Sequence, residues 1–291
     1  MVAIGLPVVM MASQSFAGLT VNLYTQGDGQ PTGYRDPGAY GGEFTAVLSG
    51  NSALETYVLD NYSSKAEATL KNGTKGFETF CIEVNETFSP GTTYNAAISS
   101  TVSPGGPDTY ITLGTAYLYS EFAQGDLSGT VGSLTVSYDY GSLTSAGREL
   151  SADELQDAIW YLQGEITTNG DIATGLKSEV SNINTTLYKF NASTDPFVLL
   201  AEEELEHSTN AAALAAIECN ANGAYNVLAL DLSCTNNNSP AQDQLVYCPV
   251  PEPGTVAAGG LLLIPLVLSA LRTLRKKESA APDPLSTKGT L

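Results

Sequence analysis

Two apolar stretches at the ends of the chain confine its folded part to residues 18–248. Residues 2–17 carry no charge, are too short to cross a bilayer comfortably, and end in Ser15-Phe16-Ala17, a pattern suited to signal peptidase. Residues 255–271 form a second uncharged apolar stretch, which is marginally long enough for a membrane helix. We therefore expect a signal peptide at 1–17, one ectodomain at 18–248 and a C-terminal transmembrane helix.

The C-terminal tail has three parts in a fixed order. Pro251-Glu252-Pro253 precedes the apolar stretch, and a basic cluster of Arg272, Arg275, Lys276 and Lys277 follows it. This order resembles the PEP-CTERM sorting signal. The resemblance implies an exosortase-type processing enzyme as partner and a cell-surface or secreted location in a Gram-negative envelope, with transient membrane anchoring. The tail would span 249–278, with a short extra tail at 279–291; an uncleaved tail anchor is the alternative.

The negative charge of the expected ectodomain limits the classes of partner that it can bind. Residues 18–248 hold seven of the 12 Lys and Arg and 28 of the 31 Asp and Glu. Such a surface repels phosphate backbones, so we expect no nucleic-acid binding. The chain is 43% apolar and has 15 tyrosines, which is enough for a folded core.

Local patterns predict an α+β fold in which strands outnumber helices. Short β-type runs are separated by Gly, Pro, Asn and Ser, and helical signals interrupt them. We expect a strand-rich single ectodomain, with β-sandwich or barrel-like sheets and inserted helices. The predicted strands are 19–24, 44–48, 56–59, 77–84, 134–138, 225–232 and 244–247. The predicted helices are 111–122, a helix from Ser151 with Glu154 as its capping box and Gly164 as its stop, 196–206 and 211–217.

Enzyme signatures are scarce. The single histidine, His207, follows an acidic run, and a solvated helix face is its expected setting. The sequence offers no obvious Ser–His–Asp set, no phosphate-binding glycine loop and no CxxC pair. We therefore expect no enzyme activity, no metal and no cofactor, although scattered carboxylates leave a secreted hydrolase as a weaker alternative.

Two short segments resemble the thioester domains of bacterial surface proteins. Phe80-Cys81-Ile82 matches the family's cysteine pattern, and Leu155-Gln156-Asp157-Ala158-Ile159-Trp160 matches its apolar-Gln-x-x-apolar-apolar pattern. Residues 114–119, between them, resemble a helical segment of these domains. The resemblance implies an internal thioester between Cys81 and Gln156, supported by Phe80, Ile82, Leu155, Ile159 and Trp160.

The chemistry of such a bond requires close placement of two groups. A cysteine thiolate attacks the glutamine side-chain amide and ammonia leaves, which needs proximity and a polarised carbonyl. An amine, such as a lysine of another protein, then takes the Gln156 acyl group and frees Cys81. We expect Trp160 to shield the bond from water. The predicted function is covalent capture of an amine on an unknown surface or matrix target, for adhesion or cross-linking.

Other readings of the cysteines stay open at this point. Cys81 in an oxidising compartment is commonly a disulfide partner, and four cysteines allow three complete pairings. A thioester would leave three cysteines, of which Cys219 and Cys234 would form a short-loop disulfide. Without a thioester, the chain would be a passive structural or carbohydrate-binding protein of the extracellular matrix.

Overall fold

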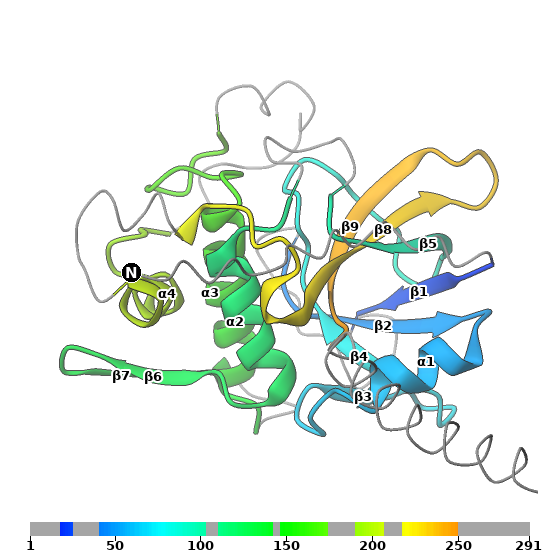
Figure 1. Ribbon diagram of the computed structural model, residues 1–291, viewed down its shortest axis with the longest axis horizontal. Helices are drawn as coiled ribbons and strands as arrows, with labels where there is room; N and C mark the ends of the chain where they lie inside the picture. Colours follow the sequence, from blue (N-terminus) through cyan, green and yellow to red (C-terminus); the bar gives the residue numbers. More distant parts are fainter. Residues whose placement is uncertain are drawn as a thin grey trace, which may run out of the picture. The chain divides into compact units, whose positions relative to one another are not determined.

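The computed structural model describes residues 18–25, 41–102, 110–141, 146–173, 190–206 and 217–249 (Figure 1). Its main feature is a seven-stranded antiparallel sheet in the order β3-β4-β2-β1-β5-β8-β9. A separate two-stranded hairpin consists of β6 (Ser128–Val131) and β7 (Leu134–Ser137). The strands of the large sheet are β1 (Thr20–Tyr24), β2 (Phe44–Ser49), β3 (Glu67–Thr69), β4 (Lys75–Thr79), β5 (Thr93–Ser99), β8 (Val227–Cys234) and β9 (Pro240–Tyr247).

The large sheet curves until its last strand meets the chain that follows β4. The Leu245 N–H donates to the Phe80 carbonyl at 3.1 Å, and the Ile82 N–H donates to the Asp243 carbonyl at 3.0 Å. Between these bonds, Cys81 and Gln244 form an isolated antiparallel bridge. The segment 80–82 therefore lies between the end of β4 and the middle of β9, although the two strands are far apart in the sheet order.

In the described part of the chain, four α-helices accompany the sheet: α1 (Ser52–Leu59), α2 (Leu113–Gln124), α3 (Ala146–Leu162) and α4 (Pro196–Glu206). Figure 1 shows α2 and α3 side by side beside the sheet, with α4 next to them. The Thr112 side chain caps the start of α2 by accepting from the Thr115 N–H, and Gly125 ends the helix at φ +77°. The buried apolar residues of the helices and the sheet form one core cluster.

The strand-rich α+β prediction is confirmed, and several element predictions hold. Strands β1, β2, β7, β8 and β9 and helices α2 and α4 overlap the segments predicted for them. The predicted strand 56–59 is wrong, because these residues complete helix α1. Its start has reciprocal caps: the Asn51 side chain accepts from the Leu54 N–H, and the Glu55 carboxylate accepts from the Asn51 N–H.

The predicted start of the third helix is also wrong. Helix α3 begins at Ala146, so Ser151 lies inside it and is no N-cap. The Ser151 hydroxyl accepts instead from the Asp139 N–H at 3.2 Å, which ties the chain after β7 to the helix. Gly164, with φ +71°, follows the helix end as expected. The predicted strand 77–84 is shorter than expected, since β4 ends at Thr79 and Cys81 makes only a bridge.

Several predictions lie outside the described residues. They are the signal peptide at 1–17, His207, most of the helix at 211–217, and the tail from residue 250 onward, with Pro251, Glu252 and Pro253. The chain divides into two units, Met1–Pro249 and Val250–Leu291, and only the first contains described structure. Within the described ranges, no helix is both long and apolar enough to cross a membrane.

Candidate functional site

The residues directly before and after Cys81 are both buried in the core. Phe80 and Ile82 are 0% and 1% exposed. Successive side chains of an extended chain point to opposite faces, so both lie on the face away from the Cys81 sulfur. The Phe80 ring packs edge-on against Phe122 of α2, with 5.1 Å between ring centroids. Phe80 therefore anchors the strand that carries the cysteine to helix α2.

Tyr119 of α2 reinforces the junction next to Cys81. Its hydroxyl lies 3.0 Å from the Glu78 carbonyl and 3.1 Å from the Leu245 carbonyl. It also bonds the Tyr62 hydroxyl at 2.9 Å. Burial raises the pKa of Tyr119, so the hydroxyl remains a hydrogen-bond donor across the ordinary pH range. The buried Tyr119 thus joins the end of β4 to β9, at a position three residues before the cysteine.

The side-chain amide of Gln156, on α3, is bonded to the main chain of Cys81. Its Oε1 accepts from the Cys81 N–H at 3.0 Å, and its Nε2 donates to the Cys81 carbonyl at 2.9 Å. A second main-chain donor, the N–H of Gly42, reaches the same Oε1 at 3.3 Å. Two N–H groups on one amide oxygen polarise its carbonyl and would stabilise the negative charge of a tetrahedral intermediate. The structure therefore brings together the two residues that the sequence singles out.

The chain before β2 covers this amide closely. An added Cβ at Gly41 would lie 2.6 Å from Cγ of Gln156 and would also collide with the ring of Trp160. Only glycine allows the main chain to lie against both side chains. Gln156 and Trp160 are each 1% exposed. Gly41 therefore packs the Gly42 donor onto the amide and, with Trp160, closes the site to water.

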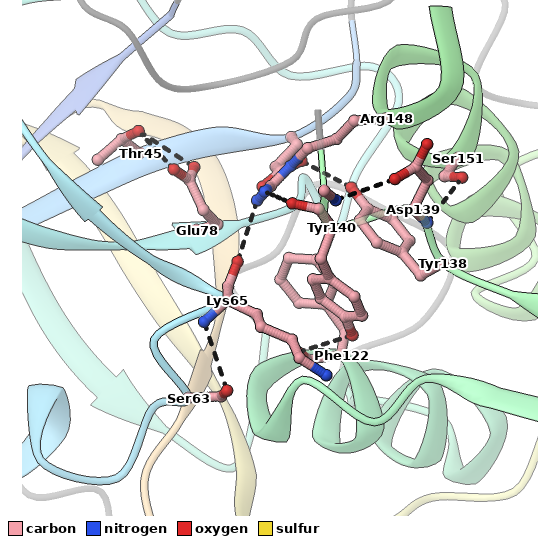
Figure 2. Close-up of polar contacts among 12 residues, drawn as sticks. Thr45, Ser63, Lys65, Glu78, Phe122, Tyr138, Asp139, Tyr140, Arg148 and Ser151 are labelled. Atoms are coloured by element: carbon pink, nitrogen blue, oxygen red, sulfur yellow. Dashed lines mark hydrogen bonds and ion pairs between the residues drawn. The ribbon is translucent and has the colours of Figure 1, made fainter. Parts of the chain in front are cut away.

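A buried ion pair holds the same segment against the start of α3. Arg148 binds Glu43 through two bonds, Nη2 to Oε1 at 2.5 Å and Nε to Oε2 at 3.1 Å. Figure 2 shows the guanidinium lying also between the carbonyls of Tyr140 and Lys65, at 2.9 and 3.3 Å. Burial opposes the charge of Arg148, but the bonds and charge of Glu43 raise its pKa. Helix α3 thus bonds residues 41–43 at two points, through Arg148 to Glu43 and through Gln156 to Gly42.

Glu78 lies close to this ion pair but does not join it. Both oxygens of its carboxyl group accept from the Thr45 hydroxyl at 3.1 Å, as Figure 2 shows. Burial and the charge of Glu43 raise the pKa of Glu78 well above its usual range. A neutral Glu78 leaves one carboxylate, Glu43, to balance the guanidinium.

The sulfur of Cys81 is enclosed in the core. Cys81 is 0% exposed, and burial raises the pKa of its thiol. A hydrogen bond from the Gln244 side chain, with Nε2 3.4 Å from Sγ, lowers the pKa, while the charge of Glu83 raises it. A thiolate, which any attack on an amide requires, is therefore costly here unless a donor stabilises it.

Buried carboxylates fix the chain beyond the cysteine. Glu83 accepts from the Asp243 N–H at 3.1 Å, and Asp243 accepts from the Leu232 N–H at 2.9 Å. The second bond satisfies a donor where the β8–β9 register shifts between Leu230 and Leu232. Each carboxylate thus replaces a missing ladder bond. The described residues contain no group of three or more His, Cys, Asp or Glu placed to hold a metal ion.

The other cysteines do not form the disulfide considered from the sequence. All four cysteines are free thiols, with Cys219 exposed and Cys234 partly buried. Cys219 lies next to the start of α2, where its carbonyl accepts from the Leu113 N–H at 2.8 Å. Cys234 ends β8, opposite Tyr94. Cys219 of the expected pair therefore lies beside the start of α2, and Cys234 lies on β8.

Gln163 provides an internal comparison for Gln156. It directly follows the same helix, which ends at Leu162, and its amide accepts from the Thr112 N–H at 2.8 Å and donates to the Tyr110 carbonyl at 3.1 Å. A side-chain amide can thus tie a helix to an extended segment with no cysteine beside it. The difference at Gln156 is the second donor on its oxygen and the cysteine on the bonded segment.

Sequence reasoning missed the residues that complete the site. Gly42 contributes only its main-chain N–H. Glu43 and Arg148 form an ion pair although they are far apart in the sequence. Gln244 contacts Cys81 because the pairing of β9 places the two residues opposite each other. The pair Gly41-Gly42 directly before a predicted strand was the one usable signal, since adjacent glycines there indicate a close main-chain approach. In comparisons with known proteins, the chain matches no family model, no curated protein and no solved structure.

Proposed function

We propose that this chain is an exported surface or matrix protein whose Cys81 and Gln156 form an internal thioester that captures an amine covalently. The observation that carries the proposal is the placement of the Gln156 amide on the main chain of Cys81, with two N–H donors on its oxygen. Two hydrogen bonds, such as those that Gln163 makes, are enough for a side-chain amide to join a helix to an extended segment. The additional donor is placed where attack on the carbonyl would develop charge.

The proposed reaction has two balanced steps. In the first, the Cys81 sulfur bonds to the side-chain carbonyl carbon of Gln156, the carbon–nitrogen bond breaks, and the thiol proton leaves with ammonia. In the second, an amine nitrogen bonds to the same carbon, the carbon–sulfur bond breaks, and a proton of the amine goes to the sulfur. The product is a stable amide, so each molecule reacts once and does not turn over.

Close placement of the two residues and preorganised donors support the first step. Both partners are fixed by main-chain bonds on rigid elements, which lowers the entropic cost of bringing them together. The N–H groups of Cys81 and Gly42 are already oriented toward the amide oxygen. Gly41 and Trp160 exclude water, which would otherwise hydrolyse the product bond.

Export and sorting form the second part of the proposal. They are supported by the apolar N-terminal stretch and by the tail with Pro251-Glu252-Pro253, an apolar segment and a basic cluster. An exosortase-type enzyme would process this tail in a Gram-negative envelope. Pro249, the first residue of the expected tail and the last described residue, accepts a hydrogen bond from the Tyr57 hydroxyl.

Intact-mass measurement of the full chain, exported to an oxidising compartment, tests the thioester. We expect a mass lower than that of the processed sequence by one ammonia. Methylamine should then add once, on Gln156, and free the Cys81 thiol. The variants Cys81→Ala and Gln156→Ala should show neither change. Gln163→Ala is the matched control, because it removes a comparable buried amide directly after the same helix and should leave the ammonia loss intact.

A wild-type mass with no ammonia loss and no amine uptake would reject the thioester. The runner-up function, a passive structural or carbohydrate-binding matrix protein, would then be the better account. Polysaccharide pull-down separates the two directly, because binding to sugar does not need the sulfur and should survive in Cys81→Ala. Covalent capture should be lost in the same variant.

A further inference from the structure

Gln244 lies directly opposite Cys81 on β9. The two residues form an antiparallel bridge, and side chains at opposite positions of such a pair share one face of the sheet. Gln244 Nε2 lies 3.4 Å from the Cys81 sulfur, within hydrogen-bond distance for that atom, and the glutamine side chain is 0% exposed. Cys81 thus lies between two buried glutamines, one bonded to its main chain and the other to its sulfur.

The polar groups of the Gln244 amide are incompletely satisfied. Nε2 also lies 3.3 Å from the Gln242 carbonyl. Oε1 is buried and has no hydrogen-bond partner among the described residues. Burying an unpaired amide oxygen costs stability, and an apolar side chain of similar size would fill the space without that cost. Packing alone therefore does not account for an amide at this position.

We infer that Gln244 is a catalytic residue of the Cys81–Gln156 thioester, whose amide N–H stabilises the Cys81 sulfur as a thiolate. The inference rests on the proposed function. The same N–H acts in both steps: on the attacking sulfur as the bond with Gln156 forms, and on the leaving sulfur as an amine opens that bond. No oxidant or further reactant is required, because the thiol proton leaves with ammonia and returns from the incoming amine.

The surroundings of the sulfur make this donor necessary. Burial raises the pKa of the Cys81 thiol, and the nearby Glu83 charge raises it further. The Gln244 hydrogen bond acts in the opposite direction. In a buried setting, a hydrogen bond to a charged atom is stronger than one between neutral groups. The contact therefore strengthens as the sulfur becomes negative.

Gln244 is not itself the acyl donor in this scheme. Its amide turns nitrogen, not carbon, toward the sulfur, and no N–H among the described residues polarises its oxygen. Gln156 has two such donors. Peptide mapping after methylamine treatment should therefore find the modification on Gln156 and leave Gln244 unchanged.

Two substitutions of Gln244 in the full chain test the role. Gln244→Leu removes the donor and keeps the volume, and we expect at least a tenfold slower methylamine uptake. Gln244→Glu keeps the size and places a carboxylate beside the sulfur, which should slow uptake further. Gln242→Leu is the matched control: Gln242 is a buried glutamine on the same strand whose amide bonds the Glu83 carbonyl. It should take up methylamine at the wild-type rate.

A second readout does not depend on thioester formation. In the Gln156→Ala background, the pH dependence of Cys81 alkylation by iodoacetamide reports the thiol titration. Adding Gln244→Leu should move that midpoint upward by about one pH unit, and adding Gln244→Glu should move it further. A purely structural role would change melting temperatures and leave the midpoint in place.

The outcomes separate the two proposals. Equal uptake rates and equal midpoints in wild type and Gln244→Leu, or methylamine found on Gln244, would overturn the role of Gln244. If the wild type never loses ammonia, the thioester proposal fails and the catalytic role fails with it. The alkylation midpoints then decide whether the sulfur contact exists at all. Should Gln244→Leu not fold, the equally sized Gln244→Glu carries both readouts.

Discussion

The side-chain amide of Gln156 bonds both polar main-chain groups of Cys81, its N–H at 3.0 Å and its carbonyl at 2.9 Å. This arrangement fixes the amide carbon beside the cysteine without any contribution from the sulfur. The strand and the helix therefore establish the geometry that the proposed thioester would need. The consequence is that changes which disturb the main chain around the amide should affect the reaction as strongly as changes to the reacting residues.

Gly41→Ala should strongly slow formation of the proposed thioester, although Cys81 and Gln156 are both unchanged. The new methyl group would collide with Gln156 and Trp160, so residues 41–43 would shift and withdraw the Gly42 donor. Loss of one oxyanion donor typically costs about 100- to 1,000-fold in rate. Intact mass against time after refolding should show the ammonia loss slowed by at least 100-fold.

Gly141→Ala is the control for that experiment. Gly141 is exposed, has no positive φ, and an added Cβ there would make only an ordinary contact at 3.4 Å with Asp139. It should form the thioester at the wild-type rate. Unchanged kinetics in Gly41→Ala would mean that the Gly42 N–H does not contribute to the reaction.

The buried Arg148–Glu43 pair should be far more important for stability than the exposed pair Lys75–Glu67. Arg148→Met leaves the Glu43 carboxylate buried with one hydrogen bond, from the Tyr138 hydroxyl at 2.6 Å. Removing one partner of such a pair costs about 3–5 kcal/mol. Lys75→Met breaks a pair whose side chains are 59% and 23% exposed and should cost less than about 1 kcal/mol. Urea unfolding of both variants checks the difference; equal costs would contradict it.

Sequence patterns predicted the elements whose residues alternate clearly and missed those without such a pattern. Strand β5 contains Asn95, Ala96 and Ala97, which are too small and too mixed to indicate a strand, and pairing on both sides holds it in place. Helix α1 appeared strand-like because Val58 and Leu59 suit either structure. The signal that decides it is the Asn51–Glu55 cap, which precedes the apolar residues.

The sequence predicted only some of the residues of the candidate site. Cys81 and Gln156 belong to short patterns that resemble a known family. Gly42 acts through its main chain, which carries no side-chain signature. The contact between Gln244 and Cys81 depends on the register of β9 against residues 80–82, and a shift by one residue would turn the glutamine to the other face. Long-range register and main-chain donors are properties of the fold, not of a local sequence.

Stability should increase as the pH falls from about 8 toward 5, the reverse of the usual behaviour of acidic groups in salt bridges. Burial raises the pKa of Asp195 to about 7 and that of Asp231 to about 8, with the Asp243 charge adding to the second. Burial also raises the pKa of Glu83. A carboxyl whose pKa is higher in the folded state binds more protons when folded, so protonation favours folding. The urea midpoint should rise over this range.

Asp195→Asn isolates one contribution to this pH dependence. The Asp195 carboxylate caps α4 by accepting from the Phe197 and Val198 N–H groups, and an asparagine oxygen can accept the same bonds. The variant should therefore keep the helix and show a smaller rise in midpoint on acidification. Asp171→Asn, at an exposed carboxylate, is the control for the loss of one negative charge. A wild-type profile that falls on acidification would contradict the assignment.

The acidic charge of residues 18–248 should favour the capture of amines that have positive charge around them. Residues 18–248 hold 28 acidic side chains against seven basic ones, and such a field raises the encounter rate of cationic partners by about 10- to 1,000-fold at low salt. Of two peptides with one lysine each, the peptide with flanking arginines should be captured at least tenfold faster than the peptide with flanking glutamates. The difference should shrink as salt rises, because the screening length falls from about 30 Å at 0.01 M to about 3 Å at 1 M. Methylamine should show much less salt dependence, and equal capture of both peptides at low salt would mean that the field does not guide the target to Gln156.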